Sequence, residues 1–593
     1  NSCLTSNKYC LHILALLSIS INVKDIEYKG YRNSIMDKNR RNFISFLGKV
    51  SLGTVVMPPF LIRCGNSSKP IPSGDLSPEV LERLINLKLE GINASDKDDL
   101  LLANGLNYHV IARWGDKIND LDRFGFNCDF TAFIPLDEKD PNDGLLWVNH
   151  EYVNSLFISG FDYKKRNNPD SLRTKEQVDL EMYNVGGSII RIKKEEGIWK
   201  LVANDPHNRR ISNHTPIRLN WDHPIKGKST VIGTNSNCSG GITPWNTFLT
   251  CEENYHNFFG ETVYDENNVP RLKKGRHDWE EYYDYPPEHY GWVVEVDPKT
   301  GDAQKHIALG RISHECCTLY QLEDERIVAY TGDDQNDEHL YKFVSSEPNS
   351  LKHGTLYVAD TINGVWLPLD WESQDILKAK FRDQTEVLVR VREAAKLLGA
   401  TPLNRPEDIE IDPITGHVFV SLTNNKPKGD YHGSILKIEE SGGAHDALIF
   451  KASTYKAGVE ESGFSCPDNL AFDHSGNLWM TCDVSGSEMN NEDKPYMAFK
   501  NNSLFVIPRY GNDAGRVIRV ASGPIDSELT GPWFSPDGKT LFLSVQHPGE
   551  QTVDIDNPTS QWPFDGDNLP KPSVVAITGD LIEKMNRLRE ITG

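Results

Sequence analysis

Positive charge is scarce in this chain of 593 residues, in which 63 lysines and arginines face 85 aspartates and glutamates for a formal net charge of −22. Binding to nucleic acid depends on neutralising phosphates with lysine and arginine, so this balance argues against a nucleic-acid partner. It also makes the protein poorly suited to attracting small anions from a distance. An anionic substrate would need bound cations or a local arginine to reverse the field at its site.

Cysteine motifs for structural zinc are also missing. The 10 cysteines include no C-x-x-C pair matched by a second such pair, which argues against a zinc ribbon. Most of them are expected to be buried free thiols that pack as small hydrophobic groups. Long apolar runs are confined to the first 62 residues, and no later segment is apolar enough to span a bilayer as a helix.

Residues 36–64 are predicted to be a lipoprotein-type Tat export signal. Arg40-Arg41 lies shortly after Met36 and leads into a mostly apolar run over residues 44–62. Twin arginines before a moderately hydrophobic segment are typical of substrates of the Tat export machinery. The run ends in a sequence that resembles a lipoprotein cleavage box, although Arg63 replaces the usual small residue. Cys64 is therefore the predicted lipidation site and the expected point of membrane attachment.

Two further segments complete this N-terminal region. Residues 1–35 precede Met36 and are interpreted as upstream read-through or a non-native extension. The alternative is that the apolar stretch at residues 11–23 is itself a signal or anchor, but it lacks a basic flank. Residues 65–80 are rich in Ser, Pro and Gly and are predicted to be a tether. We expect an exported protein, located in the periplasm or as a lipoprotein on the outer membrane or cell surface.

Residues 81–593 are predicted to form an all-β domain built from repeated strand pairs. Six segments run from apolar β-formers to Thr, Ser or Asn and then to an acid, amide or His: residues 145–151, 247–253, 327–334, 418–425, 478–483 and 541–547. Most are followed by an outer hairpin, so six units of about four strands predict a six-bladed β-propeller with long loop and helical insertions. A lone β-sandwich is the alternative, against which six matched pairs argue.

Potential metal ligands occupy one position in successive units. Glu407 in Arg405-Pro406-Glu407 and Asp468 in Cys466-Pro467-Asp468 both begin the first strand of a unit, and Glu315 and Cys238 hold the same place in earlier units. Innermost strands line the channel of a propeller, so these side chains should converge at one mouth. Four anionic groups cannot crowd there without cations.

The chemistry of these groups narrows the choice of cation. Carboxylates suit calcium or ferric iron, while a thiolate among them favours a transition metal. Taken singly, each acid would more often cap a turn, and Cys238 would more often be a buried thiol. The shared register favours a site. His150, His314 and His547 end strands near the same mouth. They are expected to hydrogen-bond the carboxylates, with direct binding of a metal ion as the alternative.

Several stretches, in matching order, resemble the PhoX family of alkaline phosphatases, which are Tat-exported six-bladed propellers. They are NHEY at residues 149–152, NCSGG at 237–241, TCEEN at 250–254, HE at 314–315, GDD at 332–334, RPE at 405–407 and QHPGE at 546–550. The resemblance covers the chain from about residue 149 to residue 550. It implies an enzyme that hydrolyses small-molecule phosphomonoesters and releases inorganic phosphate, expected as a monomer.

The resemblance also implies a cofactor of ferric iron and calcium, Fe(3+) and Ca(2+), bridged by an oxo group. Cys238 would match the cysteine ligand to iron, with Glu315 and Glu407 as further metal ligands. Arg405 would match the catalytic arginine that binds the substrate phosphate. The last two residues carried over as candidate metal ligands are Asp468 and Glu252.

The sequence departs from the family pattern at two places beside these ligands, where Cys316-Cys317 follow His-Glu and Asp408 follows Arg-Pro-Glu. Two rival functions also remain open at this point. Six-bladed calcium propellers that hydrolyse lactones share the fold and an acid-lined mouth, but they need neither a cysteine ligand nor the Arg-Pro-Glu triplet. A non-enzymatic propeller that serves as a binding platform would use the same acids only to cap turns.

Overall fold

The computed structural model of the chain describes residues 89–162 and 172–592. The predicted export signal with Cys64, the tether and residues 1–35 lie outside this part of the chain. Within the described residues, no helix is long and apolar enough to cross a membrane.

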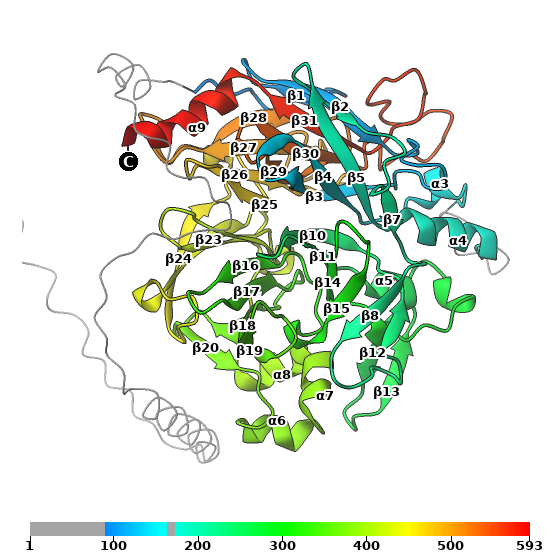
Figure 1. The fold of residues 1–593 in the computed structure, drawn as a ribbon, viewed down its shortest axis with the longest axis vertical. Helices are drawn as coiled ribbons and strands as arrows, with labels where there is room; N and C mark the ends of the chain where they lie inside the picture. Colours follow the sequence, from blue (N-terminus) through cyan, green and yellow to red (C-terminus); the bar gives the residue numbers. More distant parts are fainter. Residues whose placement is uncertain (1–88, 163–171, 593) are drawn as a thin grey trace, which may run out of the picture. The chain divides into compact units, whose positions relative to one another are not determined.

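Six sheets surround a common centre, each with one innermost strand and further strands stacked outward (Figure 1). We number them blades 1 to 6 in the chain order of their innermost strands. Neighbouring strands within a blade are antiparallel, except that β15 (Ala303–His306) and β8 (Pro216–Asn220) of blade 2 are parallel. This arrangement confirms the predicted all-β, six-bladed propeller.

Each blade is a series of strands that runs from the channel outward. Blade 1 has β3 (Cys128–Asp137), β4 (Asp140–His150), β5 (Gly186–Glu195), β6 (Ile198–Leu201) and β7 (Arg209–Ile211), and blade 2 has β10 (Asn237–Ile242), β11 (Phe248–Glu252), β14 (Val293–Val296), β15, β8 and β9 (Thr230–Ile232). Blade 3 has β16 (Thr318–Gln321), β17 (Arg326–Gly332), β18 (Leu340–Pro348), β19 (Gly354–Asp360) and β20 (Val365–Pro368), and blade 4 has β21 (Pro406–Ile411), β22 (Val418–Leu422), β23 (Ser434–Glu440) and β24 (Phe450–Ala457). Blade 5 has β25 (Pro467–Phe472), β26 (Leu478–Cys482), β27 (Ser503–Ile507), β28 (Ile518–Ser522) and β1 (Leu101–Leu102), and blade 6 has β29 (Glu528–Phe534), β30 (Thr540–Gln546), β31 (Ser573–Thr578) and β2 (Asn107–Arg113).

The six predicted second strands fall on β4, β11, β17, β22, β26 and β30, each paired with the innermost strand of its blade. Their side chains are buried on both faces, because each blade packs between two others. In β4, Leu146 and Val148 belong to one core cluster, whereas Trp147 on the opposite face belongs to another. Burying one such aliphatic side chain stabilises the fold by about 1.5–3 kcal/mol.

Blade 6 joins the two ends of the described chain and closes the ring. Its outer strand β2 comes from the N-terminal side and pairs with β31, with His109 opposite Ala576. On the inner side, Thr131 of β3 donates a hydrogen bond from Oγ1 to the carbonyl of Gly531 in β29 at 2.7 Å. Gly531 has a φ of 60°, and a Cβ there would lie 2.6 Å from the Cα of Phe130. Only glycine allows blades 6 and 1 to approach so closely.

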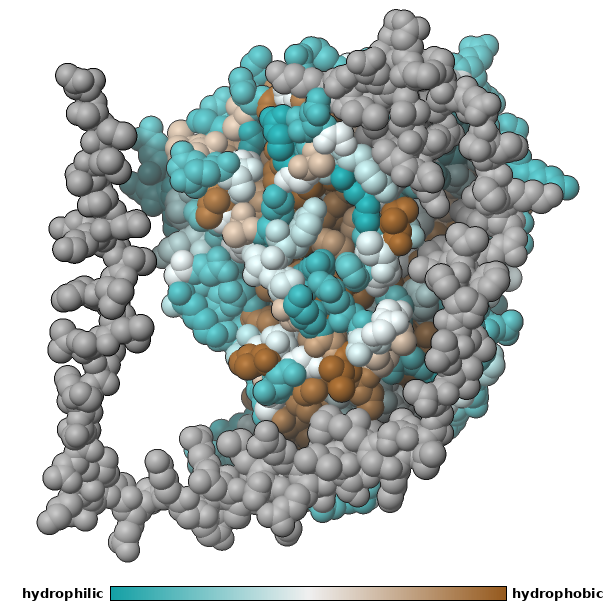
Figure 2. All heavy atoms as spheres, turned by 90° about the vertical axis from the view of Figure 1, so that its left-hand side faces the viewer, coloured by the Kyte–Doolittle hydropathy of each residue, from teal (hydrophilic) through white to brown (hydrophobic). Residues whose placement is uncertain are grey.

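Helical insertions decorate the propeller, as predicted. They are α3 (Ser155–Ile158), α4 (Lys175–Asn184), α5 (His256–Phe259), α6 (Asp375–Lys380), α7 (Gln384–Val389), α8 (Val391–Leu398) and the C-terminal α9 (Asp580–Thr592). A separate hairpin is formed by β12 (Glu261–Tyr264) and β13 (Pro270–Lys273). Helices α6 to α8 lie together at the outer side of blade 3 (Figure 1). On the face shown in Figure 2, apolar residues appear as separate groups among hydrophilic ones, as is usual for a globular surface.

Candidate metal and phosphate site

The N-terminal ends of the innermost strands bring six potential ligands to the mouth of the channel, one from each blade. They are Asp129, Cys238, Glu315, Glu407, Asp468 and Glu528. In β3, β10, β21 and β25 the ligand is the second residue of the strand, in β29 it is the first, and in blade 3 it lies three residues before β16. The structure thus brings the predicted residues Cys238, Glu315, Glu407 and Asp468 together.

A repeated backbone conformation places these side chains. In five blades the residue two positions before the ligand has a positive φ: Asn127, Ser236, Arg405, Cys466 and Asp526, with φ values of 54°, 51°, 52°, 51° and 59°. In blades 1, 2, 4 and 5 a shift in strand register follows within the next residues. Such left-handed residues and bulges are uncommon, and near active sites they re-aim side chains. In this protein they turn the ligands toward the channel mouth.

A second group of carboxylates comes from the ends of the second strands. Glu151 directly follows β4, Glu253 follows β11, Asp483 follows β26, and Asp334 lies two residues after β17. We call the full set the ring residues: Asp129, Glu151, Cys238, Glu253, Glu315, Asp334, Glu407, Asp468, Asp483 and Glu528. All of them line one cavity of about 530 Å³, a size suited to a small-molecule ligand.

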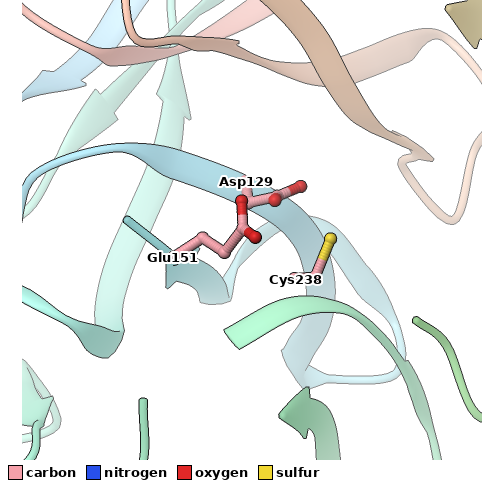
Figure 3. Close-up of side chains that lie close together, drawn as sticks. All are labelled: Asp129, Glu151 and Cys238. Atoms are coloured by element: carbon pink, nitrogen blue, oxygen red, sulfur yellow. The ribbon is translucent and has the colours of Figure 1, made fainter. Parts of the chain in front are cut away.

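Three adjoining triads within the ring residues have the geometry of cation sites. In each triad, one ligand atom per residue lies within 4.8 Å of the others: Asp129, Glu151 and Cys238; Cys238, Glu253 and Glu315; Glu315, Glu407 and Asp468. The first triad is drawn in Figure 3, where the three side chains extend into a shared space from β3, the end of β4 and β10. Cys238 and Glu315 each belong to two triads, so neighbouring cations would share ligands.

The electrostatics of the ring residues favour bound cations. Burial, followed by repulsion from neighbouring carboxylates, raises the pKa of Glu151 and Glu315 well above the usual range, and burial raises the pKa of Asp129 to about 6. Oε1 of Glu151 has no hydrogen-bond partner. Because nine carboxylates are gathered at this mouth, they could ionise together only beside cations. The residues therefore fit a metal centre of more than one ion.

The donor atoms indicate which cations would bind. The Cys238 sulfur lies 3.1 Å from Oε1 of Glu315, and burial with the nearby charge of Asp129 raises the pKa of its thiol. Among these acids, the thiol would lose its proton only when a metal ion binds the sulfur. A thiolate with carboxylates suits a transition metal, while the all-carboxylate triad suits a hard cation such as calcium.

Arg405 contacts three of the ring residues directly. Its Nε and Nη2 donate to the two oxygens of Asp334 at 2.8 and 2.7 Å, and Nη2 also lies 2.7 Å from Oε1 of Glu407. Nη1 lies 3.6 Å from Oδ2 of Asp483. The predicted phosphate-binding arginine therefore lies inside the cavity, next to the triad that contains Glu407.

The structure does not bring Glu252 into the site. Its carboxylate is fully buried, with Oε1 2.6 Å from Nζ of Lys305, and Oε2 accepts hydrogen bonds from the backbone of Gly291 and Trp292. Successive strand residues point to opposite sides, so Glu252 faces the blade interior and Glu253 faces the cavity. Glu252 stabilises blade 2, and Glu253 takes the place predicted for it.

The three histidines expected beside the carboxylates have different environments. His150 bonds to the carbonyl of Phe126 and to Ser188, so it contacts the blade instead of the ring residues. His314 bonds to Thr331 and to the carbonyl of Gly310. Only His547 lies near a ring carboxylate, with Nε2 3.5 Å from Oε2 of Glu528. The expectation is wrong for the first two histidines.

Asp408, the unusual residue after Arg-Pro-Glu, has a structural role. Its Oδ2 accepts a hydrogen bond from the backbone of Leu470 at 2.8 Å, and its Oδ1 accepts one from Ile409 at 2.9 Å. The side chain therefore ties blade 4 to blade 5 below the cavity. Cys316 is likewise fully buried, and it packs in the core beside blade 4. Neither departure from the family pattern alters the ring residues.

Gln546 supports two ring residues and was not expected from the sequence. Its Nε2 donates to Oδ2 of Asp129 at 3.0 Å and to Oε2 of Glu151 at 2.8 Å. Thr530 donates to the other oxygen of Asp129. These neutral donors hold the carboxylates in place without neutralising their charge, as partners of metal ligands commonly do. The residues QHPGE marked this stretch as distinctive, but not which side chain faces the ligands.

A six-bladed propeller that gathers carboxylates, a thiol and an arginine at its channel mouth has the architecture of a metal-dependent propeller hydrolase. The chain belongs to the PhoX family of alkaline phosphatases, because the family model described as Alkaline phosphatase PhoX matches residues 87–549. It is therefore an enzyme of the phosphomonoesterase class.

Comparison with solved structures agrees with this assignment. The chain resembles Pseudomonas fluorescens PhoX in complex with vanadate, a transition state analogue, at 29% identity and a TM-score of 0.73, over 84% of this chain and 99% of that one. Weaker likenesses are a Dyadobacter fermentans protein of unknown function (10% identity, TM-score 0.35, 81% and 100% covered) and a gluconolactonase from Xanthomonas campestris (9%, 0.29, 80% and 98%). No curated protein matched the chain.

Proposed function

We propose that this enzyme hydrolyses phosphomonoesters at a mixed iron and calcium centre held by the residues of the three triads, releasing inorganic phosphate. The observation that carries the proposal is the set of three adjoining triads that share Cys238 and Glu315, with Arg405 beside the third. A lactonase would not need the thiol or the arginine. A binding platform would not need nine converging carboxylates in one cavity.

Different residues of the triads would bind the two kinds of cation. Cys238 would bind a ferric ion as a thiolate, because it is the one soft donor and lies in two triads. Glu315, Glu407 and Asp468 would bind calcium with carboxylate oxygens, and Gln546 would hold the first triad in shape. When bound, the cofactor would supply positive charge that polarises the phosphoryl oxygens.

Arg405 would bind the phosphate group of the substrate. A planar guanidinium can donate two parallel hydrogen bonds to phosphate oxygens, which fixes the phosphoryl group as well as attracting it. Its side chain is 24% exposed, whereas Glu407 and Asp334 beside it are almost fully buried. Substrate entering from solvent can therefore reach the guanidinium without displacing the buried carboxylates.

Metal analysis with a parallel phosphatase assay tests this function. Purified protein should contain iron and calcium, hydrolyse p-nitrophenyl phosphate, and lose activity to near background after chelation because Arg405 alone cannot offset nine carboxylates. Readdition of both metals should restore activity, with magnesium as the control ion. Turnover of a lactone without phosphatase activity would favour the lactonase alternative. A protein free of both metals and inert to the phosphate ester would favour the binding platform.

We further propose export by the Tat machinery, lipidation at Cys64 and a monomeric enzyme in the periplasm or on the cell surface. Arg40-Arg41, the apolar run and Cys64 support this location, and a protein folded around a metal cofactor would need export in the folded state. Changing Arg40→Lys and Arg41→Lys together should retain the enzyme inside the cell, as measured by fractionation. Export that is insensitive to both substitutions would refute the Tat route, and Cys64→Ala isolates the lipid attachment.

A further inference from the structure

Arg405 has two edges that could each bind an oxyanion, and one of them is already occupied. The edge formed by Nε and Nη2 donates to both oxygens of Asp334, at 2.8 and 2.7 Å. Two parallel, charge-assisted hydrogen bonds of this kind fix the plane of the guanidinium as well as its position. The side chain of Asp334 is only 5% exposed, so water competes little with this contact.

The outer edge of Arg405 is formed by Nη1 and Nη2. Oε1 of Glu407 lies 2.7 Å from Nη2 but accepts no hydrogen bond, so this edge still has donors for a ligand. Asp483 lies nearest to Nη1, at 3.6 Å, which is beyond hydrogen-bond distance. Its side chain is 29% exposed and belongs to none of the three triads. The two carboxylates therefore differ in kind, because Asp334 fixes the guanidinium while Asp483 merely lies beside the edge that a phosphate would use.

Asp334 is itself held in place by the rest of blade 3. Its backbone N–H donates to the carbonyl of Ser313 at 3.0 Å. The preceding residue, Asp333, is fully buried and accepts hydrogen bonds from Arg392 of α8, one of them from Nε at 2.8 Å. Ser313 also donates its backbone N–H to Asp333 at 3.1 Å. The inserted helix α8 and the loop at Ser313 thus position the carboxylate that positions Arg405.

We propose that Asp334 is a positioning residue that presents the outer edge of Arg405 to the substrate phosphate, so that its loss weakens substrate binding although it removes a negative charge. This inference rests on the proposed function, in which Arg405 binds phosphate. A simple charge argument gives the opposite sign, because removing any carboxylate near Arg405 should strengthen the binding of an anion. Asp483, which does not fix the guanidinium, should follow the simple charge argument.

The experiment compares Asp334→Asn with Asp483→Asn in the metal-loaded enzyme. Asp334→Asn should raise KM for p-nitrophenyl phosphate and Ki for inorganic phosphate by about 10- to 100-fold, the effect of losing charged hydrogen bonds. Asp483→Asn should lower both by about two- to fivefold, as expected for a long, partly exposed charge pair. Asp334→Glu, which keeps the acceptor pair, should recover part of the loss.

Two further measurements separate positioning from other roles. In an Arg405→Ala background, Asp334→Asn should have little additional effect on KM, because the two residues act as one unit. Iron and calcium contents of Asp334→Asn should equal those of the wild type. Loss of either metal would make Asp334 a ligand and overturn the inference, as would a KM that falls as it does in Asp483→Asn.

The same variants distinguish failure of the inference from failure of the proposed function. If Arg405→Ala leaves KM and the phosphate Ki unchanged, Arg405 does not bind phosphate and the proposed role fails. If Arg405→Ala raises both constants but Asp334→Asn behaves as the wild type, only the positioning role fails. Should Asp334→Asn not fold, additive effects of Asp334→Glu and Arg405→Ala on KM would overturn it, and non-additive effects would support it.

Discussion

Replacing Cys238 with serine is expected to remove iron from the purified enzyme and to lower kcat toward p-nitrophenyl phosphate by at least about 100-fold, since loss even of an indirect metal contact costs 10- to 100-fold. Cys238 belongs to two of the three triads, so its loss weakens two neighbouring cation sites at once. A serine hydroxyl keeps nearly the same shape but does not ionise at neutral pH. The change therefore tests the soft donor and leaves the packing nearly intact.

A matched control is available in the same blade. Cys251 of β11 is fully buried in the hydrophobic core and lies outside the triads. Cys251→Ser should cost some thermal stability, because it buries a hydroxyl among apolar groups, but it should retain iron and kcat. Elemental analysis and initial rates on both variants give the comparison. Full iron occupancy in Cys238→Ser would show that the thiol is not a ligand.

The propeller could be predicted because its signal is local and repeated. Each second strand carries its own apolar pattern and ends in a polar residue, so six independent segments pointed to the same architecture. The closure of the ring has no such signal. The pairing of β2 with β31 joins His109 to Ala576, which lie at opposite ends of the described chain, and nothing near either residue specifies the other. Such long-range pairing depends on the completed ring.

The site was predictable only where the sequence marks a strand start. Proline directly before Glu407 and Asp468 fixed their register, and the neighbouring units supplied Cys238 and Glu315. Asp129 and Glu528 lack that proline and were missed. Glu252 and Glu253 are adjacent acids at the end of one strand, and the family resemblance implied the first of them. A register shift opposite them, between Asn237 and Gly240, makes simple alternation ambiguous there.

The second group of carboxylates shows a different limit. The acids that end β4, β11 and β26 were visible in the pattern of the second strands, but the pattern does not say that they meet the first-strand ligands. That meeting depends on the left-handed residues that precede the first strands, such as Asn127 and Cys466. A positive φ at a residue other than glycine is not readable from sequence. Tertiary structure therefore converted isolated strand ends into one site.

Removal of the metals is expected to make the stability of the protein fall steeply as pH rises. In the metal-free fold, burial raises the pKa of Asp129 to about 6, and burial with mutual repulsion raises the pKa of Glu253 and Glu528 further above the ordinary range. A group whose pKa is raised by folding contributes stability below its unfolded pKa of about 4, and that stability is lost as pH rises through its folded pKa. At low pH, protonation thus takes over from bound cations in neutralising these carboxylates.

Thermal unfolding with and without a chelator between pH 5 and pH 9 measures this effect. The chelated protein should lose at least about 10 °C in Tm across that range, several kcal/mol for a protein of this size, while the metal-loaded protein changes little because bound cations keep the carboxylates ionised. The difference in Tm between the metal-loaded and the chelated protein should therefore increase with pH. A constant gap would contradict repulsion among the ring residues as its cause.

A pair of variants ties the slope to the ring residues themselves. Glu528→Gln removes one buried carboxylate with a raised pKa, so the chelated variant should lose less Tm on going from pH 5 to pH 9 than the chelated wild type. Asp137→Asn, at the exposed end of β3, removes the same charge from solvent and should leave the slope unchanged. If both variants flatten the slope equally, net charge of the whole protein explains the pH dependence. If only Glu528→Gln does so, the destabilising charge lies in the cavity that the cations would neutralise.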